Sequence, residues 1–580
     1  MNNKTNKIRN YYLVQLLFVI FIIIIINIIS SYVFTRIDLT NEKRYTLSES
    51  TQQLLKDIDD IVFFRVFLDG EFPAGFKRLK RETKELLDEF RAYNKNIGYS
   101  FINPSASDNA QERNDTYQLL MEQGLNPTDL QVKTKGGMEQ QVIFPGALVS
   151  YKNNEMPIEL LDAQFNVPPE AALNNSIQNL EFKFATVISR LIKNVKPRIA
   201  FIEGHGELDD QETYDITLAL QNDYIVDRVT INEKINALVN RSLTDSVKNE
   251  YTIKPTYAAI IIASPDSLFS QKDKFIIDQY IMYGGKVMWL IDPVFASMDS
   301  IQQQENTVAI EKNIDLQNQL FNYGVRLNSD LVLDLNALPI PIRTGQVGGQ
   351  AQIDFFPWYY FPIITATSKH PIVKNLNAIK TQFVSSLSPV NVEGVKETVL
   401  LSTSDYSKTV SMPAVISLRM LQEEPNVIEY SGPSKDVAIL LEGEFKSDFR
   451  NRLPESILVD KAIGFKEKSV PTRMIVVSDG DIIKNQFHIP KGYPLPLGFD
   501  QFTRETFGNK EFILNSMNYL TDGAGLISLR SRETKLRMLN RTIINENRLT
   551  WQLINLLAPV ILVILVGFLL VWLRKRKYTK

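Results

Sequence analysis

Long apolar runs occur only at the two ends of the chain. Residues 11–34 and residues 553–573 are each long enough for the ~20 apolar residues that a membrane-spanning helix requires. A cleaved signal peptide would have an apolar core of only ~7–15 residues, so the first run is interpreted as an uncleaved anchor. Charged residues interrupt every apolar stretch between Thr35 and Gln552. The pattern therefore predicts a double-pass protein of the inner membrane.

Basic residues beside the two runs predict their orientation. Lys4, Lys7 and Arg9 precede the first run, and residues 574–577 read RKRK after the second. Lys and Arg collect on the cytoplasmic side of membrane helices. The tails, residues 1–10 and 574–580, are therefore expected in the cytoplasm and the body in the periplasm. Arginines in the linker, residues 526–552, fit this topology less well, and the RKRK flank decides the prediction.

Asn27 is a polar residue inside the first apolar run. Its side chain could bond its own backbone or reach the membrane interface, which is the reading we favour. The alternative is a contact with a partner helix, where such a polar group contributes ~0.6–2 kcal/mol.

The first part of the body, residues 35–172, is predicted as a small α/β domain with a thioredoxin-like layout. Residues 61–68 form an apolar β-rich run, and residues 76–90 place apolar side chains on one helical face. A further strand at residues 97–104 and several later strands follow. A helix at residues 173–195 connects this domain to the next one.

Residues 196–525 are predicted as a large α/β domain with a mainly parallel, flavodoxin-like sheet. Short apolar runs that end in turn residues or acids alternate with helical segments, a pattern typical of a parallel sheet covered on both faces. The runs are RIAFIEGHG, IVDRVTI, AAIIIASPD, KVMWLIDP and RMIVVSDGD. A β-rich insertion is expected at about residues 336–435.

Composition excludes several kinds of chemistry. Lys+Arg number 64 against 66 Asp+Glu, so no basic field indicates nucleic acid. Cysteine is absent, which removes disulfides, thiolate metal ligands and cysteine nucleophiles. With only three histidines, far apart in the sequence, we expect no metal site and no cofactor.

Acidic residues at the ends of the predicted strands form the candidate ligand site. In a parallel sheet the carboxyl ends of the strands share one edge, where α/β folds bind ligands. Turns and caps explain the same residue types about twice as often as a ligand site does. The candidate residues are Glu203, His205, Asp292, Asp479 and Asp481.

The segment FFPWYYFP, residues 355–362, concentrates aromatic side chains between two prolines. If exposed, Phe356, Trp358, Tyr359 and Tyr360 would form a contact patch for sugars or for a partner. If buried, they belong to the core of the insertion, which is the reading we favour.

Enzymatic motifs are missing from the sequence. It has no GxSxG elbow, no HExxH and no GxxxxGK[ST] phosphate loop. GHGELD, residues 204–209, lacks the third glycine of a dinucleotide fingerprint. Its glycines predict a turn, with Asp209 as the cap of the next helix and Glu212 closing a capping box. Ser264 could lie on a strand-to-helix turn, but no base is assigned to it. We expect no enzyme here.

Several segments together resemble a known family. FTRIDLTNEKRYTLSESTQQLLKDI, IAFIEGHGE, GGKVMWLIDP and GNKEFILNSMNYLTD resemble the GldG family of gliding-motility-associated ABC-transporter auxiliary, or substrate-binding, proteins of the Bacteroidetes. The resemblance implies a permease subunit and a cytoplasmic ATPase subunit as partners, with this chain as the extracytoplasmic component. ATP hydrolysis then belongs to the separate subunit. The resemblance also implies that residues 196–525 are similar in layout to class I amidotransferases, although the chain lacks the cysteine nucleophile of those enzymes.

Two other functions remain open at this point. One is a structural scaffold of a motility or secretion machine that binds no small molecule. The other is a cell-envelope enzyme that acts on polysaccharide, which would need paired carboxylates ~5–10 Å apart in an open groove. An acid-lined cleft at the strand ends would favour ligand binding, and a filled edge would favour the scaffold.

Overall fold

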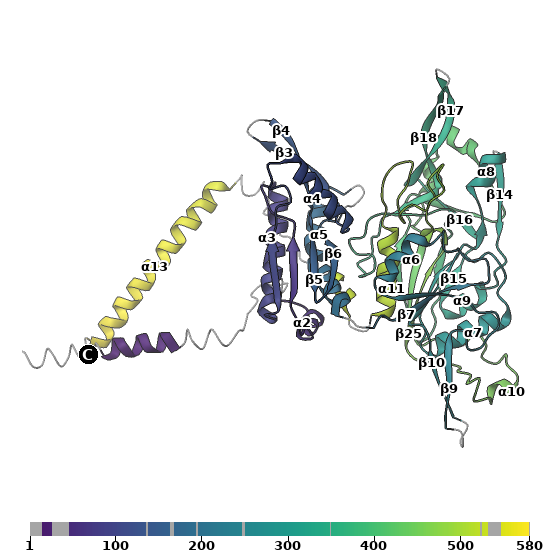
Figure 1. The fold of residues 1–580 in the computed structure, drawn as a ribbon, viewed down its shortest axis with the longest axis horizontal. Helices are drawn as coiled ribbons and strands as arrows, with labels where there is room; N and C mark the ends of the chain where they lie inside the picture. Colours follow the sequence, from purple (N-terminus) through teal and green to yellow (C-terminus); the bar gives the residue numbers. More distant parts are fainter. Residues whose placement is uncertain are drawn as a thin grey trace, which may run out of the picture. The chain divides into compact units, whose positions relative to one another are not determined.

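The chain of 580 residues is described by a computed structural model. It describes residues 14–25, 46–134, 137–162, 167–192, 195–245, 250–304, 306–347, 350–522, 525–531 and 547–578. The chain forms two compact units, one from the terminal segments 1–46 and 533–580 and the other from residues 47–532. The second unit contains every strand described below (Figure 1).

The terminal unit contains the apolar helices. Helix α13, Arg548–Tyr578, is 31 residues long, and its segment Arg548–Arg576 is long and apolar enough to cross a membrane. It begins earlier and ends later than the predicted span. At the other end the described residues Val14–Ile25 form a shorter apolar helix. Asn27 and the rest of the predicted first span lie outside the described residues.

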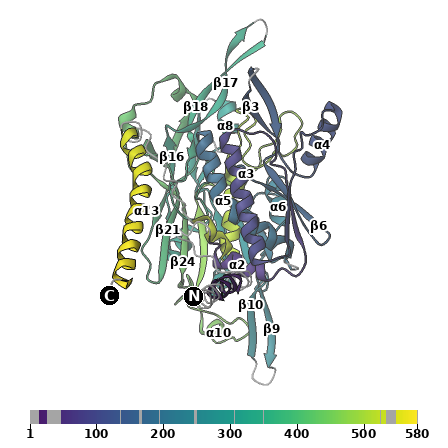
Figure 2. The same ribbon diagram turned by 90° about the vertical axis from the view of Figure 1, so that its left-hand side faces the viewer.

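A four-stranded sheet begins the body. Its order is β2-β1-β5-β6, formed by β1 (Val62–Val66), β2 (Ile97–Phe101), β5 (Gly146–Tyr151) and β6 (Asn154–Glu159). Helix α3 (Ala74–Tyr93) joins the parallel strands β1 and β2, as the strand–helix–strand pattern predicts. Helices α3 and α5 (Pro169–Ile192) share one core with this sheet, and Figure 2 shows them side by side.

The polar stretch after β2 contains structure that its pattern does not reveal. Helix α4, Ala110–Glu122, buries only Leu120 along its length. One buried residue in 13 leaves almost no apolar periodicity. The hairpin of β3 (Thr128–Thr134) and β4 (Gly137–Ile143) follows it. At the start of the body, α2 (Glu49–Lys56) is capped by the Ser48 side chain.

A nine-stranded sheet forms the centre of the second half of the body. Its parallel part runs β25-β12-β11-β7-β8, and these are the five apolar runs recognised in the sequence. Their bounds are β7 (Arg198–Glu203), β8 (Ile225–Thr230), β11 (Ala259–Ala263), β12 (Val287–Leu290) and β25 (Thr472–Val477).

The rest of that sheet is antiparallel, so the expectation of a mainly parallel sheet is only half right. Strand β24 (Asp436–Gly443) pairs antiparallel with β25, and β20 (Leu387–Pro389) and β21 (Val395–Ser402) pair with β24. Strand β15 (Val325–Leu327) closes the edge beside β20. Because β20 and β21 fall between residues 336 and 435, part of the predicted insertion belongs to the main sheet.

The remaining strands of that region form smaller sheets. The long hairpin of β17 (Ala337–Val347) and β18 (Gln350–Ile364) extends from one end of the body, and the hairpin of β9 (Val239–Asp245) and β10 (Glu250–Pro255) from the other (Figures 1 and 2). Short sheets also join β13 (Val294–Phe295) with β14 (Asn306–Glu311) and β23 (Ala414–Ser417), β16 (Asp330–Asp334) with β22 (Ser407–Ser411), and β18 with β19 (Ile379–Lys380).

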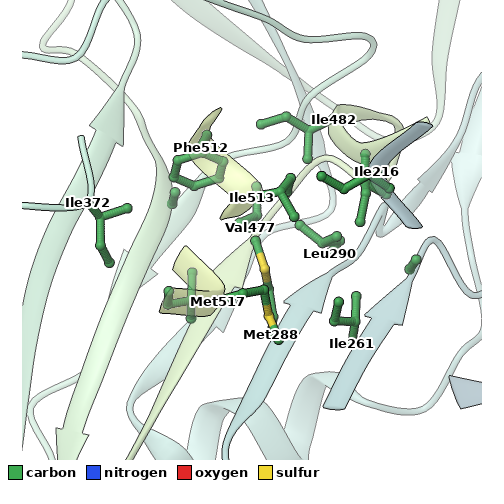
Figure 3. Close-up of a cluster of buried hydrophobic side chains, with 14 of the residues drawn as sticks. Ile216, Ile261, Met288, Leu290, Ile372, Val477, Ile482, Phe512, Ile513 and Met517 are labelled. Carbon is green, nitrogen blue, oxygen red and sulfur yellow. The ribbon is translucent and has the colours of Figure 1, made fainter. Parts of the chain in front are cut away.

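Alternate side chains of the parallel strands enter two separate cores. On one face, helices α6 (Tyr214–Gln221) and α11 (Asn509–Thr521) cover residues such as Ile261 and Leu290 (Figure 3). On the other face, α7 (Gln271–Met282) and α9 (Gln317–Tyr323) cover residues such as Ile262 and Trp289. A sheet buried on both faces explains why these strands read as continuous apolar runs.

Helix boundaries in this half follow local signals in the sequence. The Ser270 hydroxyl accepts a hydrogen bond from the backbone of Asp273 and so caps α7. Gly284, with φ +93°, ends the same helix. The predicted bonds between Asp209 and Glu212 are present, since the Glu212 N–H donates to Asp209 at 2.8 Å and the Asp209 N–H donates to Glu212 at 3.1 Å. They close the turn before α6 and do not cap the helix itself, whose N-cap is Thr213.

Truncation of Phe512 tests the packing of α11 on the sheet. Phe512 is fully buried in the core drawn in Figure 3. Phe512→Ala should lower the free energy of unfolding by ~3–5 kcal/mol, because it removes an aromatic side chain and leaves a cavity. Urea denaturation of the detergent-solubilised protein measures the change. Phe295→Ala is the matched control, since Phe295 is 53% exposed; equal losses in both variants would contradict this packing.

Candidate functional site

The carboxyl ends of β11, β12 and β25 bring together polar residues that are far apart in the sequence. Ser264 follows β11, Asp292 follows β12, and Asp479 follows β25. The Ser264 hydroxyl donates to Asp292 Oδ2 at 2.7 Å, and the Gly480 N–H donates to Asp292 Oδ1 at 2.8 Å. Lys312 Nζ lies 3.8 Å from Asp292 Oδ2. Asp292 is therefore the centre of this cluster.

Asp479 is fully buried and uses both carboxylate oxygens within the protein. Its Oδ2 accepts from the Gln382 N–H at 2.9 Å, and its Oδ1 accepts from the Asp481 N–H at 2.8 Å. The first bond joins β25 to the segment that follows β19 in the chain. Asp481 is partly exposed, and its nearest cation is Lys484 at 4.0 Å. Lys484 in turn pairs with Glu212 at 2.9 Å.

Two of the three carboxyl groups in this cluster, Asp479 and Asp481, have raised pKa values. Burial raises the pKa of Asp479 well above its usual value, and the charges of Asp292 and Asp481 raise it further. The pKa of Asp481 is raised to about 6, by burial first and then by Asp292, while Lys484 and Lys312 oppose the shift. The cluster thus favours at least one proton near neutral pH.

Close packing leaves little room between these strand ends. A Cβ on Gly480 would lie 2.4 Å from Ser264 Cβ and 2.5 Å from Asp292 Oδ2, so only glycine fits. Ser264 itself has φ +50°, a left-handed conformation that turns the chain sharply after β11. The strand edge around Asp292 is therefore filled by the protein's own groups.

The other two predicted site residues have different partners. Glu203, after β7, pairs with the Arg228 guanidinium at 2.5 Å. Arg228 also donates to the Leu208 carbonyl and to the Thr213 hydroxyl. This arrangement holds the turn between β7 and α6 and leaves Glu203 outside the Asp292 cluster.

His205 belongs to a third, buried group of its own. Its ring lies 3.1 Å from Asp273 Oδ2 and 3.2 Å from Glu207 Oε1, and it stacks on Phe269 with ring centroids 3.7 Å apart. Burial lowers the pKa of His205, but Glu207 and then Asp273 raise it more, so the net direction is upward. The expectation that His205 joins the strand-end acids in one ligand site is therefore corrected.

The described residues contain no group of three or more His, Asp or Glu side chains arranged to hold a metal ion. In the Asp292 cluster the carboxylate oxygens already accept hydrogen bonds from the protein, so a cation would have to displace them.

The aromatic segment is mostly internal. Trp358, Tyr359 and Tyr360 are 0%, 8% and 4% exposed and belong to one core cluster. Phe356 is half-buried, whereas its neighbour Phe355 is 51% exposed. The proposed contact patch is therefore core for these three residues.

Sequence reasoning missed the partners that fix the strand-end acids. Lys312 and Gln382 lie 20 and 97 residues along the chain from the aspartates that they contact, and Glu212, the partner of Lys484, lies in a different segment again. No local pattern marks such contacts. The sequence did suggest a turn at Ser264, but it gave no sign that Ser264 and Asp292 are hydrogen-bonded to each other.

Comparison with known proteins identifies a family. Residues 196–516, more than half of the chain, match the family described as "ABC-type uncharacterized transport system". The chain belongs to this family of auxiliary ABC-transport proteins. Residues 41–150 match a domain of unknown function. No curated protein matches the chain.

Solved structures show only distant likeness. The "mmIFT52 N-terminal domain" is similar with a TM-score of 0.30 and 11% identity, over 56% of this chain and 98% of that one. A putative ThuA-like protein from Parabacteroides merdae is similar with a TM-score of 0.25 and 11% identity, over 57% of this chain and 91% of that one.

The raised pKa of Asp481 predicts a pH dependence of stability. A carboxyl whose folded pKa is raised stabilises the fold below its unfolded pKa of 3.8, and this contribution is lost as pH rises through about 6. Thermal unfolding should therefore show a higher Tm at pH 5.5 than at pH 7.5, and Asp481→Asn should reduce this difference.

Asp405→Asn, at an exposed position, is the matched control for that measurement. Burial also raises the pKa of Asp278 to about 6, so the wild-type pH dependence has more than one source. The difference between wild type and Asp481→Asn isolates Asp481. An unchanged pH dependence in Asp481→Asn would show that the carboxyl titrates normally.

Proposed function

We propose that the protein is a membrane-anchored, extracytoplasmic auxiliary subunit of an ABC transporter complex associated with gliding motility. Membership of the auxiliary ABC-transport family supports the transporter role, and the apolar helix α13 supports membrane attachment. The resemblance to the GldG family supports the link to gliding. In this proposal a permease subunit and a cytoplasmic ATPase subunit complete the complex.

The proposed topology has two membrane helices, both termini in the cytoplasm and the body in the periplasm. The RKRK sequence after the apolar part of α13 and the basic residues before the first apolar run support this orientation. The helix Val14–Ile25 supports a first span, although only part of that run is described.

The state of the strand ends favours an auxiliary role over ligand binding at this edge. The Asp479 and Asp292 oxygens accept hydrogen bonds from the protein, and Glu203 is neutralised by Arg228. Releasing these groups for a ligand would leave buried donors unpaired, at ~1–3 kcal/mol each. This filled edge is the observation that favours an auxiliary role, because the sequence pattern alone did not exclude a ligand-binding site at the strand ends.

We also propose that the body has no hydrolytic activity. Ser264 lies on a sharp turn and bonds to Asp292, which superficially resembles an activated nucleophile. However, Pro265 follows it and has no N–H, so the backbone donor that usually completes an oxyanion hole beside a nucleophilic serine is missing. Ser264→Ala should therefore leave complementation of motility intact.

Reporter fusions test the topology. Fusions after Lys580 and before Lys4 should behave as cytoplasmic, and a reporter inserted at Asn153 in the turn between β5 and β6 should behave as periplasmic. An enzyme reporter that is active on only one side of the membrane measures this. A cytoplasmic signal from Asn153 would contradict the topology.

Affinity purification from membranes tests the assembly. A tagged chain should enrich one ABC permease and one ABC ATPase after mild detergent extraction, because the family works within ABC transport systems. The control is the same chain with residues 549–573 of α13 replaced by an unrelated apolar helix, which retains membrane attachment. Absence of ABC subunits from the wild-type eluate would overturn the proposal.

A further inference from the structure

A cleft with a volume of about 100 Å³ lies away from the strand-end acids. It is formed where α5, the residues directly before β7, α11 and the 3-10 helix η4 (Leu526–Ser531) meet. Helix α5 also belongs to the core of the four-stranded sheet, whereas α11 covers the nine-stranded sheet. The cleft therefore touches both sheets' helices and the segment that leads along the chain to α13.

Charges around the cleft are already neutralised. Arg190 makes a bidentate pair with Asp223, at 2.5 and 2.6 Å. Asp522 accepts from the N–H groups of Gly525 and Ile527, and Lys196 donates to the Gln221 carbonyl. Two cationic and two anionic side chains thus cancel. An ionised ligand would find no unbalanced charge to compensate its loss of hydration.

Neutral polar groups in the cleft, in contrast, are available for a ligand. The hydroxyls of Thr186 and Ser189 and the side-chain amide of Asn222 form no hydrogen bond with the described part of the chain. Asn518 uses only its Oδ1, which accepts from the Tyr224 hydroxyl, so its NH₂ is free. Ser189 is 5% exposed as a residue, but its hydroxyl oxygen is not one of the fully buried unpaired atoms, so a ligand in the cleft can reach it. Hydroxyls that both donate and accept match a ligand with the same property.

Apolar side chains complete the walls of the cleft. They are Phe182, Val195, Pro197, Leu526 and Ile527. A cleft with an apolar wall and a few convergent polar groups is the usual arrangement of a small-molecule site. An apolar wall beside hydroxyls and amides suits the C–H face and hydroxyl edge of a sugar ring or a similar polyol.

The size of the cleft limits the ligand. A volume of about 100 Å³ holds several water molecules. It is well below the ~300–1,000 Å³ of pockets for drug-sized ligands. An oligosaccharide would not fit, whereas one sugar ring replaces those waters.

We infer that this cleft binds a neutral polyhydroxylated ligand of monosaccharide size. The site is separate from the strand-end edge and does not depend on the proposed transporter partners. Since the cleft includes α5, α11 and η4, an occupying ligand would bridge the two sheets' helices and the start of the segment that continues to α13.

Titration of the purified full-length protein in detergent tests the inference. A panel of glucose, galactose, mannose and N-acetylglucosamine is compared with an amino acid and inorganic phosphate, by isothermal titration calorimetry and by the shift in Tm. At least one sugar should bind and raise the Tm, and neither ionised compound should do so. Binding of phosphate or the amino acid in place of every sugar would overturn the ligand class.

Two isosteric changes locate the site. Thr186→Val and Ser189→Ala each remove a hydroxyl that makes no bond within the described protein, so both variants should fold with the wild-type Tm in the absence of ligand. Sugar affinity should fall about tenfold or more in the double variant, since two ligand hydrogen bonds are lost. Thr367→Val, at an exposed position, is the matched control. No sugar binding at all, or unchanged affinity in the double variant, would refute the site.

Discussion

Burial of both faces of the parallel strands is the constraint on which the rest of the body depends. Successive residues such as Ile260 and Ile261 enter different cores, so the strands themselves have no solvent face. In inner strands such as β11 and β12, polar groups can then occur only where the strands end, whereas the edge strand β8 carries Asp227 and Arg228 along its length. A carboxylate without partners at the end of an inner strand would destabilise the fold, because a buried charge needs hydrogen bonds or a counter-charge. Ser264, Asp292 and Asp479 show how the chain meets this requirement.

The same hydrogen bonds give the strand ends a structural role. Asp479 joins β25 to Gln382, and Asp292 joins β12 to Gly480. Through the first of these bonds the region between β18 and β20 is fixed to the central sheet. The site that looks most like an active centre in the sequence is thus largely an internal connection. The cleft beside α5, where the Thr186 and Ser189 hydroxyls form no hydrogen bond with the described residues, has the opposite character.

The sequence predicts those elements whose burial produces a regular pattern. The five parallel strands, α3, α5, α7 and the apolar part of α13 were all recognisable, because one face or both faces are continuously apolar. Local chemistry also identified the hydrogen bonds between Asp209 and Glu212. Helix α4 buries one residue and so has no detectable period. Strands β20 and β21 were not assigned to the main sheet from the sequence. Their antiparallel pairing with β24 joins segments far apart in the chain, and no local sequence pattern indicates it.

The candidate site was harder to predict because strand order, side-chain direction and long-range partners all contribute. The predicted parallel order of the strands correctly indicated that Asp292, Asp479 and Asp481 lie at one edge of the sheet. It did not reveal that His205 turns to Asp273 on α7, or that Arg228 neutralises Glu203. Each of these partners is a side chain whose approach depends on the packed structure. The cleft near Ser189 has no sequence signature at all, since its lining comes from four separate segments.

Site-specific photo-cross-linking from α13 in intact cells tests the central claim, that this chain works as a subunit of an ABC transporter, most directly. Photoreactive residues placed one at a time at Ile561, Leu562, Val563 and Ile564 sample one turn of the helix. The account predicts a cross-link to an ABC permease from one side of that turn and none from the other. Cross-links to no transporter subunit from any of the four positions would contradict it.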